Sequence, residues 1–151
     1  MNDKARGPAT TSARVVVGVD GSSQSIAALR RASEMALESN ADLEVVTSWS
    51  YPALLSTYDL GFAPNFQEIA ESEQAKALAT VFGENLPDWV HPLIVEGNAA
   101  HQLVERSRGA QLLVVGSRGL GGFKGLLLGS VSSECAAHVK SPVLVMREVE
   151  D

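Results

Sequence analysis

The chain has 151 residues, of which 45% are hydrophobic and 20% charged, values typical of one soluble globular domain with a real core. Its net charge of −6 and the lack of a lysine- or arginine-rich patch disfavour nucleic-acid binding. No apolar run is long enough to span a membrane, and the single cysteine, Cys135, fits a reducing compartment. We therefore expect a cytoplasmic protein that binds neither membrane nor nucleic acid. A disordered tail over residues 1–13 is expected before a single domain over residues 14–148.

The first half of the chain alternates apolar strands with helical patterns. A strand is predicted at 14–19, where a β-branched run suits burial on both faces of a parallel sheet. The elements that follow are a helix capped by Ser22 or Ser23 and running to about Glu38, a strand at 42–48, a long loop at 49–65 and a helix at about 66–84. The apolar positions of the second helix are expected to face inward: Phe66, Ile69, Ala70, Ala77, Leu78 and Val81.

The second half continues the alternation. Its elements are a strand at 90–95, a short helix ending at Gly109, a strand at 112–115, a helix at 131–139 and a strand at 141–146. Pro92 assigns the first of these strands to an edge of the sheet. Alternating strands and helices predict a parallel α/β sheet with helices on both faces, joined by right-handed crossovers.

A glycine-rich segment separates the fourth predicted strand from the fourth predicted helix. Six of the chain's thirteen glycines lie from Gly116 to Gly129. Such a segment lets backbone N–H groups close on an anion at the start of a helix, where Ser130 and Ser132 add hydroxyl donors. The segment therefore predicts a site for a phosphate-bearing ligand.

The spacing of this segment differs from two well-known phosphate loops. A Walker A motif needs Gly-Lys-Ser/Thr, but Phe precedes Lys124 and Gly follows it. The dinucleotide pattern Gly-x-Gly-x-x-Gly, started at Gly119, would put its last glycine at Lys124, and it normally follows the first strand. What remains is Gly116, two residues, Gly119, nine residues, then Gly129-Ser130.

Asp20 stands at the end of the first predicted strand. Its carboxylate can accept hydrogen bonds from ribose hydroxyls or can cap the next helix, and the residue pattern alone leaves both open. If the sheet order reverses between the first and fourth strands, their carboxyl ends flank the switch-point crevice where open α/β sheets bind ligands. Asp20 and the glycine segment would then face one cavity.

With these residues the chain resembles a universal stress protein over about residues 15–147. The nucleotide-binding subgroup of that family carries Gly-x-x-Gly, nine residues, then Gly-Ser/Thr, and an aspartate after the first strand. These features are matched by Gly116, Gly119, Gly129, Ser130 and Asp20. The resemblance implies a Rossmann-like open sheet of five parallel strands in the order 3-2-1-4-5, with helices on both faces.

The resemblance also implies a cofactor, ATP with Mg²⁺ accompanying the phosphates, and a role for each site residue. Asp20 would hold the ribose, and Val46 would pack against adenine. The floor near the base would be shaped by Gly18 and Val19. The ribose and phosphates would be lined by Gly116, Ser117, Arg118 and Gly119, and the phosphates bound through N–H groups and hydroxyls by Gly129, Ser130, Val131 and Ser132. No residue is assigned as catalytic or as a metal ligand.

These features predict an ATP-binding universal stress protein that acts as a nucleotide-dependent regulator in stress response. Two alternatives stay open: a slow ATPase or autophosphorylating protein using Ser130 or Ser132, and a module that binds cyclic AMP. Members of the family commonly dimerise through the fifth strand, so a homodimer is implied, built on Val143, Leu144 and Val145. The alternative is that the chain's own tail covers this apolar edge.

Overall fold

The computed structural model describes residues 13–51, 64–118 and 128–147. Its strands are β1 (Arg14–Gly18), β2 (Asp42–Trp49), β3 (Val90–Glu96), β4 (Leu112–Gly116) and β5 (Val143–Met146). All neighbouring strands are parallel, in the order β3-β2-β1-β4-β5. The predicted sheet and its strand order are therefore confirmed.

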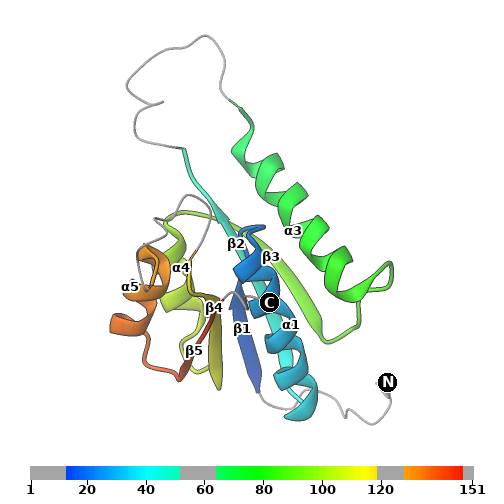
Figure 1. Ribbon diagram of the computed structural model, residues 1–151, viewed down its shortest axis with the longest axis vertical. Helices are drawn as coiled ribbons and strands as arrows, with labels where there is room; N and C mark the ends of the chain where they lie inside the picture. Colours follow the sequence, from blue (N-terminus) through cyan, green and yellow to red (C-terminus); the bar gives the residue numbers. More distant parts are fainter. Residues whose placement is uncertain (1–12, 52–63, 119–127, 148–151) are drawn as a thin grey trace.

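Helices cover both faces of this sheet (Figure 1). The described helices are α1 (Ser23–Glu38), α3 (Phe66–Phe82), α4 (Ala99–Arg106) and α5 (Ser130–His138). In Figure 1, α1 and α3 lie on one side of the sheet, and α4 and α5 lie on the other. None of the helices in the described ranges is long and apolar enough to cross a membrane.

Two apolar clusters fill the space between the sheet and these helices. Successive side chains of a strand point to opposite faces, so Val15 and Val17 join one cluster and Val16 joins the other. Leu29 of α1 fills the first cluster, and Leu103 of α4 packs in the second. The central strands are buried on both faces, which explains their nearly continuous run of apolar residues.

Cys135 lies in the second cluster with no exposed surface. Burial raises the pKa of its thiol to about 11, with a smaller contribution from the charge of Glu134. We therefore expect a thiol-alkylating reagent at pH 8 to modify the native protein only as fast as it opens, and to modify the urea-unfolded protein at once. Mass spectrometry over time measures both rates, and equal rates in the two states would contradict the buried position.

The outer position of β3 explains how the strand accommodates Pro92. The N–H of Leu43 donates to the main-chain carbonyl of Trp89 at 2.8 Å, and the N–H of Gly97 donates to the main-chain carbonyl of Trp49 at 2.8 Å. The odd-numbered main-chain groups of β3 therefore face β2, and the nitrogen of Pro92 faces away from the sheet. An edge strand tolerates a residue without an N–H at this position, as predicted.

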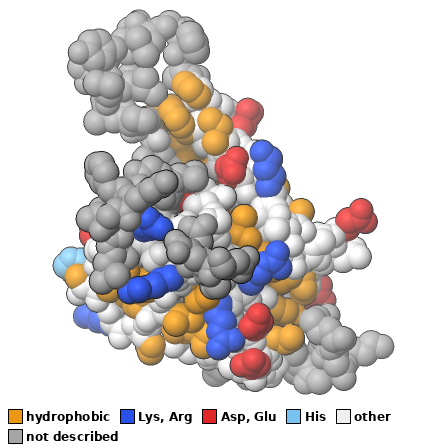
Figure 2. Space-filling model, in the orientation of Figure 1, with side chains coloured by type: hydrophobic (Ala, Val, Ile, Leu, Met, Phe, Trp, Pro, Cys, Tyr) orange, Lys and Arg blue, Asp and Glu red, His pale blue; other side chains and the backbone are white. Residues whose placement is uncertain are grey.

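One predicted inward position is wrong. Ile69 is 49% exposed, although Ala70 and Ala77 of the same helix are buried. At about 100° per residue, Ile69 lies about a quarter turn around the helix from Ala70 and Ala77, so its side chain points to one side of the face that packs on the sheet. Figure 2 shows apolar side chains gathered at the end of the molecule where α3 begins, and elsewhere on this face interspersed acidic and basic groups.

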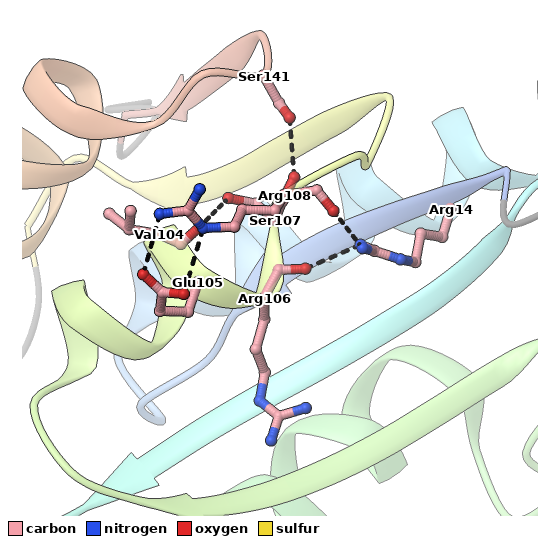
Figure 3. Close-up of polar contacts among 7 residues, drawn as sticks. All are labelled: Arg14, Val104, Glu105, Arg106, Ser107, Arg108 and Ser141. Carbon is pink, nitrogen blue, oxygen red and sulfur yellow. Dashed lines mark hydrogen bonds and ion pairs between the residues drawn. The ribbon is translucent and has the colours of Figure 1, made fainter.

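The start of β1 is tied to the end of α4 (Figure 3). Arg14 Nη1 donates to the carbonyl of Arg106 at 2.8 Å, and Arg14 Nη2 donates to that of Arg108 at 2.6 Å. From the other side, Ser141 Oγ donates to the carbonyl of Ser107 at 2.8 Å. A cation at a helix C-terminus satisfies carbonyls that have no partner within the helix. These bonds fix α4 and thereby place its opposite end at the carboxyl edge of the sheet.

Candidate functional site: a cavity at the switch point

A cavity of about 230 Å³ lies at the carboxyl edge of the sheet, and we call it the switch-point cavity. It lies between the neighbouring parallel strands β1 and β4. The chain after β1 continues to α1 on one face of the sheet, and the chain after β4 continues to α5 on the other face. The ends of β1, β2 and β4 and the starts of α1, α4 and α5 supply its walls. Its lining residues are Gly18, Val19, Asp20, Ser25, Val46, Ser48, Ala99, Leu103, Val115, Gly116, Arg118, Gly129, Ser130, Val131 and Ser132.

Most of the residues predicted from the sequence meet in this cavity. The ten that line it are Gly18, Val19, Asp20, Val46, Gly116, Arg118, Gly129, Ser130, Val131 and Ser132. Ser117 is buried beside the cavity, with 4% of its surface exposed. Gly119 lies outside the described residues. The segments that were linked only by a predicted strand order are therefore adjacent in space.

Asp20 is held by the first turn of α1. Its Oδ1 accepts the N–H of Ser22 at 2.9 Å, and its own N–H donates to Ser25 Oγ at 3.2 Å. Ser22, and not Asp20, is the N-cap of α1, since its hydroxyl accepts the N–H of Ser25 at 3.2 Å. The Ser22 N–H thus orients the carboxylate of Asp20, a residue that lines the cavity.

The part of the cavity beside β1 and β2 is apolar. Val46 is 2% exposed and Leu103 is 4% exposed, and both side chains belong to the second core cluster. A Cβ placed on Gly18 would lie 2.8 Å from Leu103 Cδ1. Glycine at the end of β1 therefore lets Leu103 pack directly over the strand. A flat apolar wall of this kind suits an aromatic base.

Gly116 lines the cavity and also makes a packing contact that the sequence did not indicate. A Cβ on Gly116 would lie 2.9 Å from the carbonyl carbon and 2.9 Å from the Cβ of Gln24. The glycine therefore allows the start of α1 to approach the end of β4, and this approach brings Asp20 and Ser130 to the same cavity.

The start of α5 differs from the other helix starts in the described chain. Ser22, Asn65 and Asn98 each accept an N–H from the first turn of their helix through a side-chain oxygen. Gly129 is the N-cap of α5, and no side chain caps this helix. The first-turn residues Ser130, Val131 and Ser132 line the cavity together with Arg118. Such an end favours a bound anion.

Five lining residues were not predicted: Ser25, Ser48, Ala99, Leu103 and Val115. Ser25 lies three residues after Ser22, at the position whose N–H an N-cap serine side chain accepts. Its place near the end of β1 could therefore have been predicted from this spacing. Ser48 follows Val46 on the same face of β2, so the period of the strand also indicates it. Ala99 and Leu103 belong to α4, and their presence depends on how this helix packs across the sheet.

Together, the parallel sheet and the cavity at its switch point define the chain as an α/β protein of the open, Rossmann-like class. The model of the universal stress protein family matches residues 12–147, and the chain belongs to this family. The family resemblance seen in the sequence is confirmed. Its narrower assignment to the ATP-binding subgroup stays a prediction.

Several relatives are similar along most of the chain. Universal stress protein Rv2623 of Mycobacterium tuberculosis is 40% identical over 142 residues, which cover 93% of this chain and 47% of the relative. Rv1996 of the same organism is 39% identical over 143 residues, 92% of this chain and 45% of the relative. This chain thus spans about half the length of the curated relatives it matches. A universal stress protein solved in complex with cAMP superposes with a TM-score of 0.66 and 29% identity, covering 90% of this chain and 98% of the other.

Proposed function

We propose that the switch-point cavity binds an adenine nucleotide, ATP accompanied by Mg²⁺, and that this binding makes the protein a nucleotide-dependent regulator in stress response. One observation carries the proposal. Asp20, the apolar side chains of Val46 and Leu103, and the start of α5, which no described side chain caps, all line the same cavity. Carboxylate, apolar wall and anion site match the ribose, base and phosphates of a nucleotide.

The base is expected to lie beside β2. Paired residues of β1 and β2 end at Gly18 and Val46, and a last bond joins Val19 N–H to the Val46 carbonyl at 2.9 Å. β2 continues to Trp49, beyond the last residue of β1, and Ser48 in this extra length of β2 lines the cavity. An N–H and a C=O at a strand edge form a donor–acceptor pair that adenine can match, while Val46 and Leu103 contact its ring.

The phosphates are expected at α5. Ser130, Val131 and Ser132 present the first-turn N–H groups of this helix, and the Ser130 hydroxyl and Arg118 also line the cavity. Dipole and N–H groups together stabilise negative charge there. Mg²⁺ would arrive on the phosphate oxygens and neutralise part of their charge, as it does when few protein ligands are offered. No residue of this chain is assigned to the metal.

Cyclic AMP is the second candidate ligand. It is favoured by the structure with a TM-score of 0.66 and 29% identity, which was solved in complex with cAMP. The base and ribose contacts proposed above serve either nucleotide, since both carry adenine. The two nucleotides differ in their phosphates: ATP would present a chain of three phosphate groups to α5, and cAMP would present a single cyclic phosphate.

Calorimetric titration of the purified protein tests the proposal. We expect saturable binding of ATP in the presence of Mg²⁺ and a weaker signal with GTP, because the base contacts are specific for adenine. Titration of ATP into protein saturated with cAMP then ranks the two candidates. If cAMP binds more tightly than ATP, the second candidate replaces the first. If neither nucleotide binds at millimolar concentration, the proposal is wrong.

A homodimer through β5 is part of the same proposal. β5 is at the edge of the described sheet, and its four residues are half-buried. Val143 and Val145 pack on one core cluster, and Leu144 packs on the other, so the strand is held firmly by its own chain. A short, apolar and well-anchored edge is suited to pairing with a second copy.

A further inference from the structure

We propose that Ser132 is a positioning residue: its hydroxyl closes the base of the glycine-rich segment and so orients the start of α5 for phosphate. The inference rests on the proposed nucleotide function. In it, the Ser132 hydroxyl bonds main-chain carbonyls of the protein and does not itself bind the phosphates. Ser132 Oγ donates to the Ser117 carbonyl at 2.9 Å and lies 3.1 Å from the Gly129 carbonyl. Its side chain therefore joins the residue after β4 to the residue before α5.

The contact is part of a firm closure centred on Ser117. The N–H of Ser117 donates to the Met146 carbonyl at 2.6 Å, and its carbonyl accepts the N–H of Gly129 at 2.6 Å. The Ser117 peptide is thus anchored to the end of β5 on one side and to the start of α5 on the other. With Ser132 Oγ as a second donor, this carbonyl uses both of its lone pairs.

The start of α5 differs from the other described helix starts in two ways. In α1, α3 and α4 the N-cap side chain accepts the N–H three residues later, from Ser25, Glu68 and His101, whereas the N-cap of α5 is a glycine. The equivalent third residue of α5 is Ser132, and its hydroxyl bonds the Ser117 carbonyl outside the helix, whereas the Ser25 hydroxyl of α1 bonds the carbonyl of its own N-cap. Since no side chain of the described residues caps α5, the proposal assigns the N–H of Ser132 to the ligand and its hydroxyl to the direction in which the first turn points.

Burial makes this hydroxyl sensitive to substitution. Ser132 is 2% exposed, so water does not readily replace a lost bond. Removing the hydroxyl leaves the Ser117 carbonyl with one donor and lets the first turn of α5 tilt. Phosphate binding depends on that tilt, whereas the base and ribose contacts come from β1, β2 and Asp20. Removal of the hydroxyl is therefore expected to weaken the binding of ligands that carry phosphate groups, and not the binding of a nucleoside.

The test compares Ser132→Ala with Ser133→Ala, because Ser133 is the next residue on α5 and is exposed. Calorimetry measures ATP and adenosine binding to each variant and to wild type. We expect Ser132→Ala to bind ATP roughly three- to tenfold more weakly, the range of one neutral hydrogen bond, and to bind adenosine as wild type does. Ser133→Ala should match wild type with both ligands. Ser132→Thr, whose hydroxyl can still reach the preceding turn, should restore ATP affinity.

Each other outcome counts against the inference. Unchanged ATP affinity in Ser132→Ala overturns it while leaving the proposed function intact. An equal loss of ATP and adenosine binding also overturns it, because general damage to the fold would then explain the effect. If Ser132→Ala does not fold, Ser132→Cys keeps the volume with a weak donor, and the same ATP-specific loss is expected there. A wild-type protein that binds no adenine nucleotide refutes the proposed function and this inference together.

Discussion

Replacing Gly116 by alanine is expected to lower the free energy of unfolding by about 1–3 kcal/mol, the usual cost of overpacking a tight contact. The added methyl group would lie 2.9 Å from the Gln24 carbonyl carbon and 3.1 Å from its oxygen. These are backbone atoms of α1, so no side-chain rotation can relieve the clash. Either α1 or the end of β4 must move, and both are packed into the sheet.

Gly18→Ala is the matched control for this variant. Gly18 also ends a central strand, but its added methyl group would meet the flexible end of Leu103 at 2.8 Å. Leu103 can turn aside, so we expect a change in unfolding free energy below about 1 kcal/mol. Urea denaturation of both variants measures the difference. Equal destabilisation of the two would show that the approach of Gln24 does not limit residue 116.

The alternation of strands and helices along the chain was predictable because each element carries a local signal, whereas the strand order came from the family resemblance and is confirmed by the structure. Arg14–Gly18 and Leu112–Gly116 are continuous apolar runs that only a doubly covered sheet can bury. Pro92 marks an outer strand. The inward face of α3 was predicted too broadly. Ile69 lies about a quarter turn around the helix from Ala70 and Ala77, so its apolar character alone overestimated its burial.

The site was predictable where its residues lie at the ends of predicted elements. Asp20 was identified at the end of the first strand and Ser130 at the start of the helix after the glycine-rich segment, and both line the cavity. Leu103 was missed because its place over Gly18 depends on the crossing of α4. The contact of Gly116 with Gln24 was missed for a similar reason, since nothing near Gly116 in the sequence indicates it. Spacing thus identifies the residues around a switch point, and tertiary packing decides what each one touches.

Replacing Asp20 by asparagine is expected to weaken ATP binding by about 1.5–3 kcal/mol, roughly ten- to a hundredfold, the range of a hydrogen bond to a charged group. Asparagine keeps an oxygen that can accept the Ser22 N–H, which Asp20 Oδ1 accepts at 2.9 Å. The start of α1 should therefore stay in place, and the unfolding free energy should fall by no more than about 1 kcal/mol, the favourable interaction of a charge with a helix start. Calorimetry and urea denaturation measure the two quantities separately.

A nucleotide without ribose hydroxyls identifies what Asp20 recognises. If the carboxylate binds these hydroxyls, the wild-type protein should bind 2′,3′-dideoxyadenosine triphosphate more weakly than ATP, whereas Asp20→Asn should discriminate little between them. The two changes then remove the same interaction, and their effects are not additive. If Asp20 acts only by bonding the Ser22 N–H, the losses from the variant and from the dideoxy ligand should simply add. Additive losses would assign Asp20 to the start of α1 and would remove the ribose contact from the proposed site.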